Sequence, residues 1–294
     1  MKDEYQPFAE RKRMTRLGEA VAVLLRRQRK PIIEDIDIWE ILEEIYKNKS
    51  VSYLRGDAPT SSSLSRTKLL LSAERVISRD HNYRRSWRVN ELPDIPADEA
   101  VCLMDRGTCI SHLSAMQIYK ISERRPLQLY ITVATNEQWR EMVAKTNHGN
   151  DAPLTVRRHH PPVVRSRKID ALQTKNFPSI TQMRGSFVRA TEIGQTFLDM
   201  LESPERCGGM SHVLDVFNNH AEKYLKQIVE RIDRTETKLT KVRAGYIISE
   251  LLGISNPTVE SWSQFAQRGG SQKLDPKAVY ASQFSERWML SLNV

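Results

Sequence analysis

The apolar residues of this chain occur only in short runs, and this limits what it can fold into. The longest uninterrupted run covers residues 20–25. A helix that crosses a membrane needs about 20 consecutive apolar residues, so we expect no membrane span. Hydrophobic residues still make up 39% of the 294 residues, which is enough to form real cores. The sequence therefore predicts a globular protein of roughly two domains.

The N-terminal residues and the cysteines bear on the cell compartment. Residues 1–16 are charged and lack the apolar stretch of a secretory signal. The three cysteines, Cys102, Cys109 and Cys207, are too few and too scattered for a disulfide framework. We therefore expect reduced, mostly buried thiols and a cytoplasmic protein.

The positive charge is concentrated in two parts of the chain, whose overall net charge is +9. Residues 1–90 carry 19 basic and 13 acidic side chains, a net charge of +6, and residues 151–185 carry 7 and 2, a net charge of +5. Residues 91–150 carry 6 and 8, and residues 186–294 carry 13 of each. A basic N-terminal unit and a second basic stretch suggest a polyanionic partner, most simply nucleic acid, although many ordinary proteins are basic.

Apolar spacing in the first 90 residues predicts three helices and a hairpin. Residues 17–25 and 38–45 repeat at helical intervals, and Pro31 separates them. After a turn at residues 55–59, residues 60–71 predict a third helix, capped by Thr60 or Ser61 and anchored by Leu64 and residues 69–71. Residues 75–79 and 84–89 predict two strands joined by a turn.

Three helices followed by a hairpin is the order of a winged helix-turn-helix domain, which we place at residues 1–92. The third helix would enter the major groove, with the short side chains of Ser62, Ser63 and Ser65 allowing a close approach. Arg66 can read guanine with two hydrogen bonds, and Lys68 can reach a phosphate. The hairpin would be the wing, with arginines for phosphates or the minor groove. These are Arg75, Arg79, Arg84, Arg85 and Arg88.

Two other interpretations of this region stay open. The serine run could be a flexible linker, and the arginines could be a solvated strand face. The serine run leads directly into an apolar helical stretch, and the five arginines fall within fourteen residues that contain one acidic residue, Asp80. Both observations favour DNA binding.

The middle of the chain predicts helices at residues 97–104 and 108–121 and a strand at 127–133. His112, among apolar neighbours, is expected to be structural. Residues 146–168 predict a basic loop, because Pro161 and Pro162 argue against a helix. His159 and His160 would point to opposite faces of a strand, so we expect no metal there. The basic residues that could add phosphate contacts are Arg157, Arg158, Arg165, Arg167 and Lys168.

The last third predicts mainly helices and little chemistry. A strand at 186–191 precedes helices at 192–201, 210–233 and 239–252 and a further helix that begins at Pro257, and residues 288–294 predict a final strand. No P-loop, GxSxG or HExxH motif is present. Cys207, His212 and His220 match no zinc spacing. We expect no catalytic residue, no metal and no cofactor.

Five stretches of the chain resemble the AbiEi family of antitoxins, from type IV toxin–antitoxin systems. They are residues 111–115 leading into the strand at 127–133, residues 204–217 (PERCGGMSHVLDVF), 241–254 (KVRAGYIISELLGI), 268–276 (RGGSQKLDP) and 285–294 (SERWMLSLNV). None of these motifs is catalytic, and their order is the stronger signal. With the N-terminal interpretation, the resemblance spans most of the chain.

The resemblance implies a helix-rich α+β fold with an N-terminal winged helix-turn-helix and a larger mixed α/β antitoxin domain at residues 93–294. Whether that domain divides again near residue 185 stays open. The resemblance implies autorepression at inverted repeats in the chain's own promoter. It also implies self-association on double-stranded DNA and action against a cognate nucleotidyltransferase toxin. Arg243, Arg268 and Lys273 lie in the resembling stretches and are candidates for partner contacts.

Two alternatives from other functional classes remain. A turn at residues 268–271, with Lys273 and Asp275 nearby, could cradle a phosphate and serve a phosphotransferase that acts on a partner protein. Such a turn more often simply ends a helix. The chain could also be a non-catalytic adaptor whose basic faces are only solvated.

Overall fold

The computed structural model describes residues 15–146, 160–267 and 272–294, and these divide into two compact units. The described part of the first unit is residues 15–96 with residues 160–161, and that of the second is residues 97–146 and 162–294. The break after Pro96 lies close to the expected domain boundary at residues 92–93. Both units combine helices with antiparallel or mixed sheets, so the predicted α+β class is confirmed.

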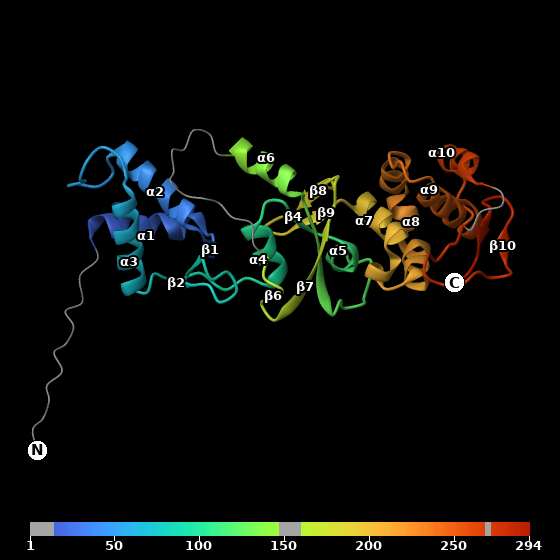
Figure 1. Cartoon of the computed structure of the whole chain (residues 1–294), viewed down its shortest axis with the longest axis horizontal. Coiled ribbons are helices and arrows are strands. Elements are labelled where there is room, and N and C mark those ends of the chain that lie inside the picture. The colour runs from blue at the N-terminus through green and yellow to red at the C-terminus, as the bar shows by residue number, and fades with distance from the viewer. Residues whose placement is uncertain (1–14, 147–159, 268–271) are drawn as a thin grey trace, which may run out of the picture. The chain divides into compact units, whose positions relative to one another are not determined.

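The first unit is built from three helices and a three-stranded sheet (Figure 1). Its elements are α1 (Arg16–Gln28), β1 (Ile32–Ile33), α2 (Asp35–Asn48), α3 (Ser61–Ala73), β2 (Ile77–Arg79) and β3 (Trp87–Val89). The sheet is antiparallel in the order β1-β3-β2. The helical faces predicted from the apolar spacing pack inward and bury Val21, Leu25, Ile38, Leu42 and Ile45.

Helix α3 begins as the sequence predicts, at a Thr60 cap. The Ser63 amide donates to Thr60 Oγ1 at 3.2 Å, and the Thr60 amide donates to Ser63 Oγ at 2.8 Å, which makes a reciprocal capping box. The linker interpretation of the serine run is therefore wrong. One predicted anchor is also wrong: Leu64 and Leu71 are buried, but Leu69 is 71% exposed, because three consecutive leucines cannot all face the same side of a helix.

The second unit is organised around a six-stranded mixed sheet in the order β6-β7-β5-β4-β9-β8. The strands are β4 (Thr108–Ile110), β5 (Gln128–Val133), β6 (Val163–Val164), β7 (Arg167–Gln173), β8 (Ile180–Gln182) and β9 (Arg189–Thr191). The pairs β5–β7 and β4–β9 are parallel, and the other neighbours are antiparallel. Helix α4 (Ala97–Met104) precedes the first of these strands, and α5 (His112–Ile118) and α6 (Asn136–Thr146) lie between strands.

The predicted helix at residues 108–121 is wrong in its first turn. Residues 108–110 form β4, which pairs with β5 on one side and β9 on the other, and all three residues are buried. A short, wholly buried stretch in the middle of a sheet has the same pattern as a buried helical turn, so periodicity does not separate the two. The helix itself starts at His112, after Ser111.

The structure bears on two further points about the middle of the chain, the predicted basic loop and the open question of a division near residue 185. Much of the predicted basic loop at residues 146–168 lies outside the described residues, but Arg167 and Lys168 begin the regular strand β7. No domain boundary falls near residue 185. Gly185 lies in the hairpin between β8 and β9, and both strands belong to the same sheet.

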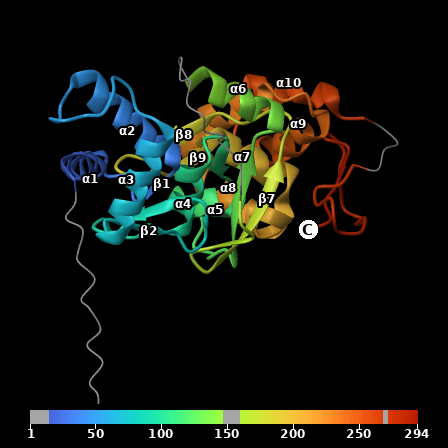
Figure 2. The same cartoon turned by 60° about the vertical axis from the view of Figure 1, so that its left-hand side comes forward.

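The rest of the second unit is helical and ends in a short hairpin. The elements are α7 (Ile193–Glu202), η1 (Pro204–Cys207), α8 (Met210–Asp233), α9 (Lys238–Gly245), the π-helical η2 (Tyr246–Leu251), α10 (Pro257–Ser261), η3 (Trp262–Phe265), β10 (Phe284–Ser285) and β11 (Leu290–Ser291). Figures 1 and 2 show α7 and α8 next to each other beside the six-stranded sheet. Their contact is close at Gly194, where an added Cβ would lie 2.3 Å from the Gln227 carbonyl oxygen.

Within the described residues, no helix is both long enough and apolar enough to cross a membrane.

Candidate functional site

Helix α3 presents one face to solvent and one to the core. Ser62, Ser65, Arg66 and Leu69 are exposed, and their spacing of three and four residues puts them on one side of the helix. The opposite side carries Leu64, Thr67 and Leu71, all buried. The exposed face therefore combines two hydroxyls, one guanidinium and one leucine side chain, and we call these four residues the α3 face.

Two of the five residues predicted on this helix have partners inside the unit. The Ser63 hydroxyl belongs to the capping box and also donates to the Thr60 carbonyl at 2.7 Å. Lys68 Nζ lies 2.6 Å from Asp35 Oδ2, and the Trp87 indole N–H donates to Asp35 Oδ1 at 2.8 Å. Asp35 therefore joins α3 to α2 and to β3, and Lys68 holds this junction rather than pointing freely to solvent.

The predicted wing arginines do not share one face of the hairpin. The register pairs Arg79 with Trp87 and Ser78 with Arg88, so Arg79 and Arg88 lie on opposite sides of the sheet. The Arg79 guanidinium lies 3.6 Å from the centre of the Trp87 ring and donates to the Arg85 carbonyl. Arg88 is half-buried and 4.0 Å from Asp94. Both side chains are therefore held in place.

The remaining wing arginines, Arg75, Arg84 and Arg85, are exposed. Between Pro59 and Val89 the chain has only two carboxylates, Asp80 and Glu74. Asp80 is 1% exposed and accepts from the backbone amides of Asn82 and Tyr83. Its carboxylate therefore stabilises the turn and is not presented to solvent. Glu74 is then the one exposed carboxylate among seven basic side chains of this segment.

The accessory phosphate contacts lie in the second unit or outside the described residues. Arg157 and Arg158 are among the residues that the structure does not describe. Arg165 lies in the turn between β6 and β7 with a left-handed backbone, at φ 47°. Arg167 and Lys168 open β7, and Arg167 donates to the Gln128 carbonyl at 3.4 Å.

Two of the three residues predicted to contact a partner form hydrogen bonds within the second unit. Arg243 is 6% exposed and donates to the carbonyls of Lys273 and Leu201, so the prediction that it meets a partner at the surface is wrong. Lys273 is half-buried, and its Nζ donates to the Ala278 carbonyl at 2.8 Å. Arg268 lies outside the described residues. Arg243 thus links α9 to the end of α7 and to the backbone at Lys273, whereas the Lys273 side chain bonds within its own segment.

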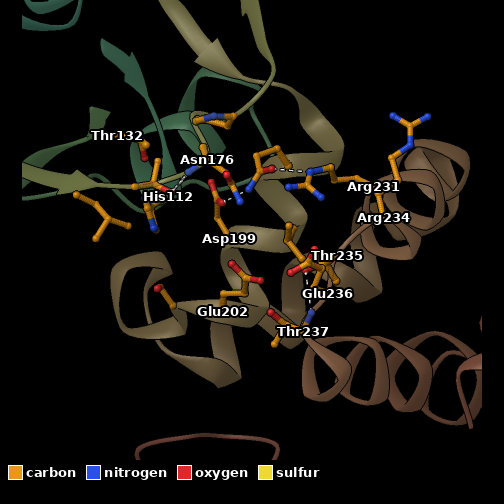
Figure 3. A pocket seen from close by; sticks show the side chains of 16 residues that line it. His112, Thr132, Asn176, Asp199, Glu202, Arg231, Arg234, Thr235, Glu236 and Thr237 are labelled. Carbon is orange, nitrogen blue, oxygen red and sulfur yellow. Dashed lines mark hydrogen bonds between the residues drawn. The ribbon is translucent and has the colours of Figure 1, made fainter. Parts of the chain in front are cut away.

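The second unit contains a polar cavity of about 370 Å³, which the sequence did not indicate as a site. It lies at the carboxyl ends of the parallel strands β5 and β7, beside α7 and the connection from α8 to α9 (Figure 3). Ligand sites in open sheets favour this position. Its lining includes His112, Thr132, Thr174, Asn176, Gln195, Asp199, Glu202, Arg231, Arg234 and Glu236.

A hydrogen-bonded relay crosses the wall of this cavity. Arg231 Nε donates to Gln195 Oε1 at 2.6 Å, and Gln195 Nε2 donates to Asp199 Oδ1 at 2.6 Å. Asp199 is 8% exposed, and its second oxygen, Oδ2, has no hydrogen-bond partner within the described residues. Burial raises the pKa of Asp199 to about 7. The hydrogen bond from Gln195, the charge of Arg231 and the nearby backbone N–H of His112 oppose this only in part, although that N–H does not reach hydrogen-bond geometry with Oδ2.

His112 adds an uncharged ring and a strained backbone to the cavity. Its φ is +50°, a conformation that costs energy for a residue with a side chain. Its Nδ1 lies 2.8 Å from Ser111 Oγ, which also accepts from Thr132. Burial lowers the pKa of His112 to about 3. His112 is thus buried and hydrogen-bonded, as expected, and it also faces the cavity.

A weak sequence signal for this cavity exists. Gln195 and Asp199 lie four residues apart on a helix in which every residue from Gly194 to Leu201 is buried. A polar pair at that spacing inside an apolar helix indicates a buried network. Among the described residues no cluster of three or more His, Cys, Asp or Glu could hold a metal ion.

Comparisons with known proteins bear on the fold alone. A scan against protein-family models finds no match, and a search of curated proteins finds none similar in sequence. The fold is similar to that of the crystal structure of the RV2827C protein from Mycobacterium tuberculosis, with a TM-score of 0.51. The two are 10% identical, and the match covers 95% of this chain and 92% of that chain. The AbiEi resemblance therefore stays a prediction.

The raised pKa of Asp199 predicts a pH-dependent stability. The unfolded carboxyl ionises near its ordinary value of 3.8 and the folded one near 7, so the free energy of unfolding falls as the pH rises between these values. Asp199→Asn cannot ionise. We expect the stability of this variant relative to wild type to increase by on the order of 2 to 4 kcal/mol from pH 4 to pH 8.

Urea unfolding of the full chain over this pH range measures the difference. Glu222→Gln, at an exposed position on α8, is the matched control and should not reproduce the change seen with Asp199→Asn. A pH-independent difference between Asp199→Asn and wild type would contradict the raised pKa.

Proposed function

We propose that this chain is a transcriptional repressor that binds double-stranded DNA of its own promoter through its first unit. In this proposal residues 15–96 act as a winged helix-turn-helix, α3 enters the major groove, and the hairpin β2–β3 is the wing. The α3 face carries the proposal, because it presents Arg66 between short hydroxyl side chains, with no carboxylate on the helix. We infer that the protein acts in the cytoplasm.

The charge distribution supports a polyanionic partner at this surface. Five acidic residues lie on α2 and none on α3, so the two helices differ sharply in charge. Exposed Arg75 precedes the hairpin, and exposed Arg84 and Arg85 lie in its turn, without ion pairs to other described residues. Exposed arginines free of carboxylate partners can bind phosphates, and release the counterions condensed on the DNA, without first breaking a salt bridge.

The first prediction separates base reading from phosphate binding. Arg66→Ala should relax the preference for promoter DNA over a scrambled duplex by about 5- to 100-fold. Arg84→Ala and Arg85→Ala should instead weaken binding to both duplexes and lower the slope of log affinity against log salt by about one unit each. Fluorescence anisotropy of the full chain across a salt series measures both quantities.

Lys47→Ala is the control, since Lys47 is exposed on the acidic helix α2 and should have no effect on either quantity. Equal affinity of the wild type for promoter and scrambled DNA would refute sequence-specific repression.

The second prediction concerns Leu69, the exposed apolar residue of the α3 face. In the major groove an apolar side chain at this position would contact a thymine methyl group. Replacing the contacted thymine by uracil removes that methyl and should weaken wild-type binding by about 3- to 10-fold. Leu69→Ala should bind the thymine and uracil duplexes equally.

A scan of promoter duplexes with single uracil substitutions finds the position by anisotropy. Val23→Ala, at an exposed position on α1, is the control and should keep the wild-type sensitivity. If no substitution distinguishes wild type from Leu69→Ala, Leu69 reads no methyl group.

We further propose that the second unit counters a cognate nucleotidyltransferase toxin, and that copies of the chain assemble on inverted repeats. This proposal rests on the AbiEi resemblance of five stretches. All five belong to the second unit, and the structure describes them except for residues 268–271. The two activities would belong to different units, so they should separate by mutation.

Coexpression tests that separation. The wild-type chain should restore growth to cells that express the toxin encoded beside it, and the Arg66→Ala variant should restore growth equally well. Loss of rescue in Arg66→Ala at equal protein levels would show that neutralisation depends on DNA binding. Absence of rescue by the wild type would remove the antitoxin part of the proposal.

The phosphotransferase alternative gains no support from the residues that suggested it. Lys273 donates to the Ala278 carbonyl, and Asp275 accepts from the Lys277 amide. The turn at residues 268–271 lies outside the described residues. The adaptor alternative would leave the α3 face and the exposed arginines without a use.

A further inference from the structure

The cavity beside α7 has features that a purely structural pocket does not need. It brings together a buried carboxylate, an uncharged histidine with a strained backbone and a half-buried arginine, all in the second unit. Perturbed titratable groups and strained residues gather at binding and catalytic sites. The volume of about 370 Å³ lies within the range of small-molecule sites.

The relay through Gln195 holds a carboxyl group and a guanidinium group at a set separation. Gln195 is 7% exposed and bonds both Arg231 and Asp199, so neither side chain can turn away without breaking a buried hydrogen bond. Within the described residues the other guanidinium nitrogens of Arg231 have no acceptor and can bond to a ligand. Figure 3 shows Arg231 extending toward Gln195 and Asp199, and Arg234 extending away from them.

Asp199 Oδ2 is the incomplete part of this arrangement. A buried oxygen without a hydrogen-bond donor destabilises the folded state, and native proteins satisfy most such groups. Glu202 lies one helical turn further along α7 and also lines the cavity (Figure 3). A donor group placed between these two carboxyls would satisfy Oδ2.

The charges restrict the class of ligand. An anion without a donor group would meet the carboxyls of Asp199 and Glu202, and a cation without an acceptor would meet the guanidinium of Arg231. A molecule with one ammonium and one carboxylate group meets both requirements. We propose that this cavity binds a free amino acid, with its ammonium group on Asp199 and Glu202 and its carboxylate on Arg231.

This inference is independent of DNA binding and goes beyond it. The site lies wholly in the second unit, and its residues do not overlap the α3 face or the hairpin. An assay that contains no DNA and no toxin therefore tests it directly.

The experiment uses the full chain and the twenty standard L-amino acids as probes, each at about 10 mM, in saturation-transfer NMR followed by calorimetry of any binder. We expect at least one amino acid to bind with a dissociation constant of about 1 mM or tighter. Its N-acetyl form lacks the ammonium group and its amide form lacks the carboxylate. Each of these should bind at least tenfold more weakly.

Variants locate the site. Asp199→Asn should weaken binding of the free amino acid at least tenfold, and Arg231→Gln should do the same and make the free and amide forms equal. Glu222→Gln and Lys226→Gln, at exposed positions on α8, are the controls and should bind like wild type. Glu202→Gln replaces Asp199→Asn if the latter does not give a wild-type thermal transition.

Three outcomes would overturn the proposal. The first is that none of the twenty amino acids binds the wild type. The second is that N-acetyl and free forms bind equally, which would leave the ammonium group without a role. The third is that Asp199→Asn, folded like wild type, binds with unchanged affinity, which would place the ligand elsewhere.

Discussion

The carboxylate of Asp35 fixes the geometry on which the first unit depends. It accepts from Lys68 on α3 and from the Trp87 indole on β3, while it sits itself at the start of α2. Arg79 then stacks on Trp87 from the neighbouring strand. One partly buried side chain therefore joins two helices and both strands of the hairpin. The orientation of the α3 face relative to the hairpin follows from these contacts.

A comparable arrangement organises the second unit around α7. This helix is buried from Gly194 to Leu201, and Gly194 allows it to approach the Gln227 carbonyl of α8 closely. The close approach puts Gln195 within hydrogen-bond distance of Arg231. Packing of the apolar face and formation of the polar relay are thus two results of the same helix contact. The cavity exists where the relay meets the ends of β5 and β7.

Local sequence was sufficient for much of the fold. The caps at Thr60 and Asn256, the helix at Met210–Asp233 and the strand at Gln128–Val133 follow from rules that act over a few residues. The candidate interface was predicted in part. Ser62, Ser65 and Arg66 are exposed as expected, whereas Ser63 and Lys68 have internal partners and Arg243 is buried. Ser63 bonds to Thr60 within the same helix cap, whereas the partners of Lys68 and Arg243 lie far along the chain, such as Asp35 for Lys68.

The sequence by itself determined the α+β class, the charge concentrated near the N-terminus and the position of most helices, because these depend on composition and on contacts between near neighbours. Tertiary structure alone decided that residues 108–110 form a central strand, that Leu69 faces solvent, and that Gln195, Asp199 and Arg231 meet around a cavity. Those outcomes depend on which distant surfaces pack together. A periodic pattern specifies that a face is apolar, but not which partner covers it.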